Sequence, residues 1–155
     1  MKVTLLNERK EFAHYQKLAK TYSKLEGLIE AINRKGIPDE NVLLINTDIK
    51  MINSFSGSDK ELTRLLKKTY TKIITYLEQE LSLVTKSHYQ KTWMVYGMLA
   101  GLLFSTLIPS FYESATWAST SLGLSMGMLM GIVAGKNKDK TIEKAGFQLD
   151  INPSF

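Results

Sequence analysis

The side chains best suited to acid–base or metal chemistry are few in this chain and lie far apart in its sequence. The two histidines, His14 and His88, have no group of acids nearby, although histidine is the usual catalytic base. The chain has no cysteine, which excludes disulfides and thiolate metal sites, and it lacks the common catalytic and nucleotide-binding motifs. Paired carboxylates can be imagined at Glu26 with Glu30 and at Glu78 with Glu80, but these acids lie among lysines, as on a solvated helix face. We therefore expect no enzyme, metal site, cofactor or small-molecule substrate.

Tyrosines are conspicuous along the amino-terminal half of the chain. The default interpretation is packing in a core or an interface, because the ring buries a large apolar area. The alternative is a face that binds a protein partner, and its candidate residues are Tyr15, Tyr22, Tyr70 and Tyr76.

The net charge of +5 raises the question of nucleic acid. The basic residues are scattered among acids, and no basic cluster with interleaved aromatic residues occurs. A solvated surface together with lysines that set membrane topology explains the charge better, so we predict no nucleic-acid partner.

The elements that dominate the sequence are two apolar runs, over about residues 93–111 and 116–135. Between Thr92 and Gly135 the chain carries one charge, Glu113, in a segment typical of a turn. Each run is about 20 residues long, the length that an α-helix needs to cross a bilayer core of about 30 Å. Lysines flank both outer ends and none occurs near Glu113, so the positive-inside rule predicts both termini in the cytoplasm. The sequence thus predicts a two-span hairpin in the inner (plasma) membrane.

Both runs carry a small residue at every fourth position, which places these residues on one face of each helix. Small residues let two helix backbones approach closely, and close packing drives helix association in lipid. In an antiparallel hairpin centred near Ser114, Gly97 falls opposite Gly131 and Gly101 opposite Gly127. We favour packing within one chain, and the alternative is a homo-oligomeric zipper. The predicted packing residues are Gly97, Gly101, Ser105, Ser119, Gly123, Gly127, Gly131 and Gly135.

The amino-terminal part, residues 1–91, is predicted to be a cytoplasmic three-helix domain. Asn7 is a candidate N-cap for a helix over about 8–35, and a second helix starts at Pro38 and runs to about Phe55. Both show the 3-4 apolar spacing of a bundle or coiled coil. A capping box at Ser58 opens a third helix, which either continues unbroken into the membrane or breaks near residues 86–89.

The remaining residues, 136–155, are predicted to form a cytoplasmic tail. The basic segment after Gly135 can extend the preceding helix as far as Gly146. Residues 147–153 have no regular pattern and are predicted to be irregular. Residues 1–6 carry no decisive pattern and are left without an assigned structure.

A resemblance follows from the glycines at 123, 127, 131 and 135 and the basic segment that comes directly after them. This part resembles the uncharacterised small bacterial glycine-zipper two-span membrane proteins, in which a glycine-rich span precedes a short basic segment and a Gly-x-Gln-Leu-like ending. The resemblance covers about residues 93–149. It implies a bacterial inner-membrane setting and no known activity.

These observations predict an all-α protein with a cytoplasmic helical domain on a transmembrane hairpin. The expected function is that of a non-enzymatic membrane anchor whose helical domain binds a protein partner or itself, because its apolar seams exceed what one short helix can cover. The alternative is a membrane effector that forms an oligomeric pore through the glycine stripe. A membrane immunity protein is a third possibility.

Overall fold

The computed structural model describes residues 1–7, 15–107 and 116–151, and the side chains of residues 116–119 lie outside this description. The described residues are mostly helical, which confirms the all-α expectation. Two short strands pair with each other. The elements are α1 (Gln16–Lys35), α2 (Asp39–Asn53), α3 (Asp59–Leu81), β1 (Val84–Thr85), α4 (His88–Leu107), α5 (Thr116–Lys144) and β2 (Gln148–Leu149).

The chain divides into two compact units. The first comprises residues 1–84 and the end of the chain from Leu149, and the second comprises Thr85–Gln148. This division differs from the expected one, in which residues 1–91 formed one part and residues 136–155 a separate tail.

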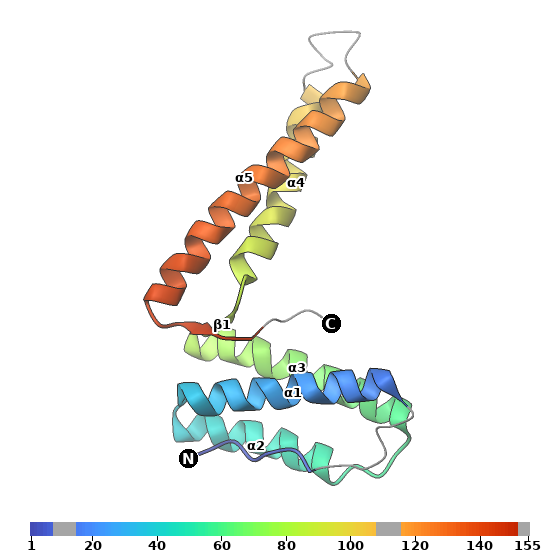
Figure 1. Ribbon diagram of the computed structural model, residues 1–155, viewed down its shortest axis with the longest axis vertical. Helices are drawn as coiled ribbons and strands as arrows, with labels where there is room; N and C mark the ends of the chain where they lie inside the picture. Colours follow the sequence, from blue (N-terminus) through green and yellow to red (C-terminus); the bar gives the residue numbers. More distant parts are fainter. Residues whose placement is uncertain (8–14, 108–115, 152–155) are drawn as a thin grey trace. The chain divides into compact units, whose positions relative to one another are not determined.

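The first unit is a layer of three helices, α1, α2 and α3, around one apolar core (Figure 1). The 3-4 spacing seen in the sequence places its apolar residues on the inward faces of these helices. Consequently the helices of the unit cover these apolar seams themselves in the part of the chain that the structure describes. The side chains with no exposed surface are Leu25, Leu28, Ile29, Ile49, Leu66 and Leu77.

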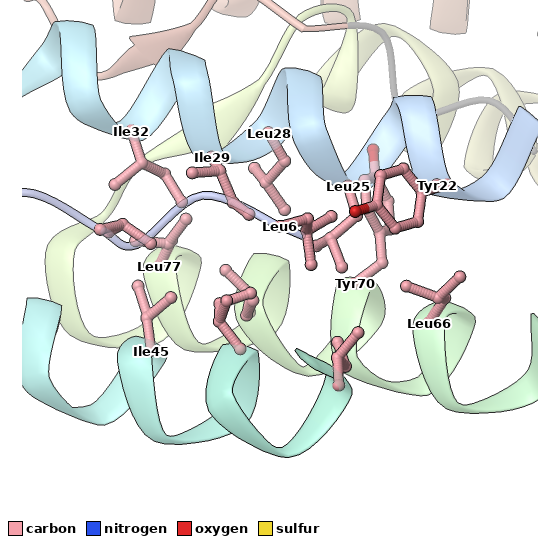
Figure 2. Packing of buried hydrophobic residues seen from close by; sticks show 14 of the residues in the cluster. Leu6, Tyr22, Leu25, Leu28, Ile29, Ile32, Ile45, Leu66, Tyr70 and Leu77 are labelled. Carbon is pink, nitrogen blue, oxygen red and sulfur yellow. The ribbon is translucent and has the colours of Figure 1, made fainter. Parts of the chain in front are cut away.

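The first seven residues form an extended segment that completes this core. Val3 and Leu6 are buried, and Figure 2 shows Leu6 among side chains of α1 and α3. The hydroxyl of Tyr22 donates a hydrogen bond to the carbonyl oxygen of Asn7. The proposed N-cap role of Asn7 concerns a helix start at residue 8, and residues 8–14 lie outside the described ranges.

Three asparagines, Asn33 on α1 with Asn46 and Asn53 on α2, hold the backbone of this segment. The Val3 N–H donates to Asn33 Oδ1 at 2.7 Å, and Asn33 Nδ2 donates back to the Val3 carbonyl at 3.0 Å. The Thr4 N–H donates to Asn46 Oδ1 at 2.7 Å, and Asn53 bonds the backbone further along. Extended backbone between helices has no strand partner, so these amide groups satisfy it instead.

Both predicted bounds of the second helix and the predicted start of the third are confirmed within about two residues. Pro38 is the N-cap of α2. At the start of α3, the Ser58 hydroxyl accepts from the Glu61 N–H while the Glu61 carboxylate accepts from the Ser58 N–H, which is the predicted capping box.

The third helix does not continue unbroken into the following apolar run, so that alternative was wrong. It ends at Leu81 because Ser82 adopts a left-handed conformation with φ 52°. The N–H groups of Ser82 and Leu83 both donate to the Leu77 carbonyl, a common way to close a helix end. Ser87, also at positive φ, precedes the first residue of α4.

The predicted helical extension of the basic segment is confirmed, because α5 runs without interruption to Lys144 and Gly146 follows at φ 79°. The prediction of an irregular ending from residue 147 was wrong in part. Gln148 and Leu149 form β2, which pairs with β1, and Leu149 is 2% exposed in the core of the first unit. Burial of this apolar side chain stabilises the packing of residue 149 in the core of the first unit.

Hydropathy sets a limit on the two long apolar helices. Within the described ranges, no helix combines the length and the apolarity that a membrane span requires.

Candidate functional site

The second unit is an antiparallel pair of helices, α4 and α5, in direct backbone contact (Figure 1). A methyl group placed on Gly97 would lie 2.2 Å from the carbonyl oxygen of Gly127 and 3.0 Å from the Cα of Gly131. One placed on Gly101 would lie 2.1 Å from the carbonyl oxygen of Gly123. Real Cβ atoms do not approach so closely, so these positions accept glycine alone.

Ser105 continues this contact toward the end of α4. Its side chain is 1% exposed, and a methyl group on Gly123 would lie 2.8 Å from its Cβ. The Ser105 hydroxyl donates to the Leu102 carbonyl at 2.7 Å, so the buried polar group is satisfied within its own helix. Ser119, the partner expected beyond Gly123, lies in α5, but its side chain is outside the described part of the chain.

Toward the other end of the hairpin the same face of α5 carries Gly131 and Gly135. Methyl groups there would lie 2.2 Å from the Trp93 carbonyl oxygen and 2.6 Å from the Tyr89 carbonyl oxygen. The structure therefore brings together, from both helices, all the predicted packing residues except Ser119, whose side chain it does not describe.

Asp139 is a residue of this contact that the sequence reasoning missed. It follows Gly135 by four residues, so it occupies the next position of the same helix face, and it is 8% exposed. Its carboxylate accepts hydrogen bonds from the backbone N–H groups of Tyr89 at 3.0 Å and Gln90 at 2.9 Å. These are two of the N–H groups that the first turn of α4 leaves without a helical acceptor. The fourfold spacing could have revealed it, but the charge suggested a solvated tail.

Aromatic contacts surround this end of α4. The Lys138 ammonium lies 4.4 Å from the centre of the Tyr89 ring, and the His88 ring meets the Tyr89 ring edge-on at 5.1 Å between centres. Tyr89 thus ties the start of α4 to α5 through both its backbone and its ring.

The surface of the helix pair reverses the usual order of a soluble fold, because small residues lie inside and large apolar ones outside. On α5 these outer residues are between 59% and 69% exposed. An apolar groove of about 860 Å³ runs beside the glycine contact. The exposed apolar side chains of the pair are Trp93, Val95, Tyr96, Leu99, Leu102, Leu103, Phe104, Leu122, Met126, Leu129, Met130 and Val133.

The four candidate tyrosines do not form one exposed face. Tyr22 and Tyr70 are buried in the core of the first unit, and burial raises the pKa of Tyr70 above its ordinary value. Tyr76 is half-buried and accepts a hydrogen bond from Asn41 Nδ2 at 3.0 Å, while Tyr15 is exposed. The core interpretation therefore holds for Tyr22 and Tyr70.

Large exposed apolar side chains occur in the first unit on α2 instead. Leu43, Leu44 and Met51 are each exposed by half or more, and helical spacing places them within about 100° of one another around the axis. The sequence analysis did not identify this face because the 3-4 apolar spacing of α2 indicates only its buried side.

Within the described ranges, no three histidine or acidic side chains gather to hold a metal ion. No family model, curated protein or solved structure matches the chain. The glycine-packed hairpin with its Asp139 cap is accordingly the candidate site, and its chemistry is that of helix packing.

Proposed function

We propose that this protein is a non-enzymatic membrane anchor. Its α4–α5 hairpin inserts into the inner (plasma) membrane with both chain termini in the cytoplasm, and its amino-terminal helical unit binds a protein partner or a second copy.

The observation that carries this proposal is the inside-out packing of the hairpin. Between helices in lipid, the hydrophobic effect gives no driving force, and close contact through small residues replaces it. The α4–α5 contact is formed mainly by glycine backbones, whereas Leu103, Phe104 and Leu122 are each at least 68% exposed. An apolar surface of this extent has a high free energy in water, and lipid is the solvent that suits it.

The sequence supports the same arrangement at both ends of the hairpin. The apolar run that begins at Trp93 continues in the sequence to Ile108, one residue beyond the described end of α4. In α5 the apolar run ends at Gly135, and lysines begin at Lys136. Bases at these ends and none near Glu113 favour cytoplasmic termini.

The packing favours an anchor over a pore built through the glycine stripe. Gly97, Gly101, Gly127 and Gly131 already contact one another within the chain. A pore that used the same stripe between copies would first have to separate α4 from α5.

The interaction role is supported by exposed apolar residues of α2 rather than by the candidate tyrosines. Leu43, Leu44 and Met51 present apolar surface on an otherwise ordinary soluble helix, as a protein-binding face does. Photo-crosslinking from position 44 in intact cells is expected to give a discrete adduct, whereas position 60, exposed on α3, should not.

Topology can be tested with single cysteines because the natural chain has none. We expect Glu113→Cys to react with a membrane-impermeant maleimide added to spheroplasts. Lys144→Cys should react only after the membrane is opened, and both variants should stay in the pellet after carbonate extraction.

Equal labelling of both cysteines before lysis, labelling of neither before lysis, or release of the chain by carbonate would overturn the proposed topology. The cysteine-free parent controls for background labelling.

A further inference from the structure

One side of α5 carries exposed apolar side chains along its middle part and lysines nearer its carboxyl end. Leu122, Met126, Leu129 and Val133, here called the outer stripe, are spaced 4-3-4 and are all highly exposed. The same spacing continues to the exposed Lys136 and Lys140. At 100° per residue, all six side chains therefore lie along one side of α5.

Lys136 and Lys140 also line a polar pocket of about 340 Å³ within the second unit. Lys86, which precedes α4, lines it as well, together with the polar side chains of Ser87 and Gln90. Three lysines from two segments of the chain thus meet around one hollow.

Two acids face this pocket, Asp139 and Glu143. Both oxygens of Asp139 are engaged, because they accept the N–H groups of Tyr89 and Gln90. With three lysines against these two carboxylates, the pocket carries an excess of positive charge and presents ammonium donors to an anion.

The length of the outer stripe fits one leaflet of a bilayer. From Leu122 to Val133 the helix rises about 16 Å at 1.5 Å per residue, close to half of a bilayer core of about 30 Å. A lipid with its headgroup at the lysines would have an acyl chain long enough to follow the outer stripe.

We propose that the pocket formed by Lys86, Lys136 and Lys140 binds the phosphate-bearing headgroup of an anionic phospholipid, whose acyl chain lies along the outer stripe. This inference rests on the proposed membrane insertion. A soluble phosphate would use the lysines alone, whereas the adjoining apolar stripe favours a ligand that is anionic at one end and apolar at the other.

The test compares lipid affinities of the full chain in a neutral detergent by native mass spectrometry. We expect phosphatidylglycerol to bind about tenfold more tightly than phosphatidylcholine, a difference of about 1.4 kcal/mol, because lysines attract an anionic headgroup. The double variant Lys136→Gln/Lys140→Gln should bring the ratio of the two affinities close to one. Lys91→Gln/Lys144→Gln removes the same charge at positions that do not line the pocket, and it should keep the ratio.

A third arm adds millimolar glycerophosphoglycerol, the headgroup without acyl chains, and we expect it not to displace phosphatidylglycerol. Displacement would overturn the lipid assignment in favour of a soluble anion. A ratio near one in the parent chain, or equal losses in both double variants, would overturn the pocket itself. Carbonate extraction tests insertion separately. A chain that stays in the pellet but shows no lipid preference overturns the pocket alone, whereas a chain released by carbonate overturns the proposed function as well.

Discussion

The carboxylate of Asp139 accepts the backbone N–H of Tyr89 across fifty residues of sequence, at a distance of 3.0 Å. Helix α5 therefore supplies the N-terminal cap of α4, a role that a residue next to the helix usually fills. The same residue ends the row of glycines through which the two helices touch. Packing and capping together fix how far α4 can slide along α5.

Replacing Asp139 with alanine should lower the free energy of unfolding of the hairpin by about 1 kcal/mol, because two N–H groups lose their acceptor. Both tryptophans of the chain, Trp93 and Trp117, belong to the second unit, so their fluorescence during thermal unfolding in detergent follows that unit. Glu143→Ala, one turn further on α5 and exposed, should leave the midpoint unchanged. Equal midpoints for both variants would argue against the cap.

Two glycines in helices should respond in opposite directions to alanine. At Gly127 the new methyl would lie 2.2 Å from the Gly97 carbonyl oxygen, so Gly127→Ala should destabilise the hairpin by about 1–3 kcal/mol. At Gly27 in α1 nothing lies within 4 Å, so Gly27→Ala should stabilise the first unit by about 0.5–1 kcal/mol.

Tryptophan fluorescence measures the first effect, and hydrogen exchange of the Leu25 and Ile29 amides measures the second. If Gly127→Ala unfolded at the same temperature as the parent chain, the close backbone contact would be ruled out.

The hairpin contact was predictable from sequence because small residues at fourfold spacing have one good use between helices, and antiparallel pairing fixes the register. Asp139 escaped prediction because a charged residue among lysines is typical of a solvated surface, although its place four residues after Gly135 puts it on the glycine face of α5. Leu149 escaped for a related reason, since a single apolar residue after a charged segment carries no periodic pattern. The burial of Leu149 depends on a core built almost entirely from residues 3–83.

The end of α3 was hard to predict because serine gives no sign of a left-handed conformation. Ser82→Gly should stabilise the first unit by about 1 kcal/mol, since glycine adopts φ 52° without a Cβ clash. Ser54 caps α2 at φ −87°, where glycine has no such advantage, so Ser54→Gly should be neutral or destabilising. Urea unfolding of the first unit, monitored by hydrogen exchange, distinguishes the two variants. A destabilising effect of Ser82→Gly would contradict the assigned conformation.

The asparagines that hold the first seven residues give a separate prediction. Asn46→Ala removes the acceptor of the Thr4 N–H, and Asn46 is 8% exposed, so we expect a loss of about 1–2 kcal/mol and faster exchange of the Thr4 amide. Thr47→Ala, at the exposed neighbouring position of α2, is the matched control. Unchanged protection of the Thr4 amide in Asn46→Ala would show that the hydrogen bond contributes little.

Ionisation of Tyr70 should lower the stability of the first unit as the pH rises above about 10. Burial raises the pKa of Tyr70 in the folded chain, so the unfolded chain loses this proton first. The stabilising contribution is complete below the unfolded pKa of about 10 and is lost as the pH rises through the folded value.

Urea midpoints from pH 8 to 11 should therefore fall less steeply for Tyr70→Phe than for the parent chain, whereas Tyr15→Phe, at an exposed ring, should follow the parent. Parallel curves for all three chains would mean that Tyr70 ionises as easily in the folded chain as in the unfolded one.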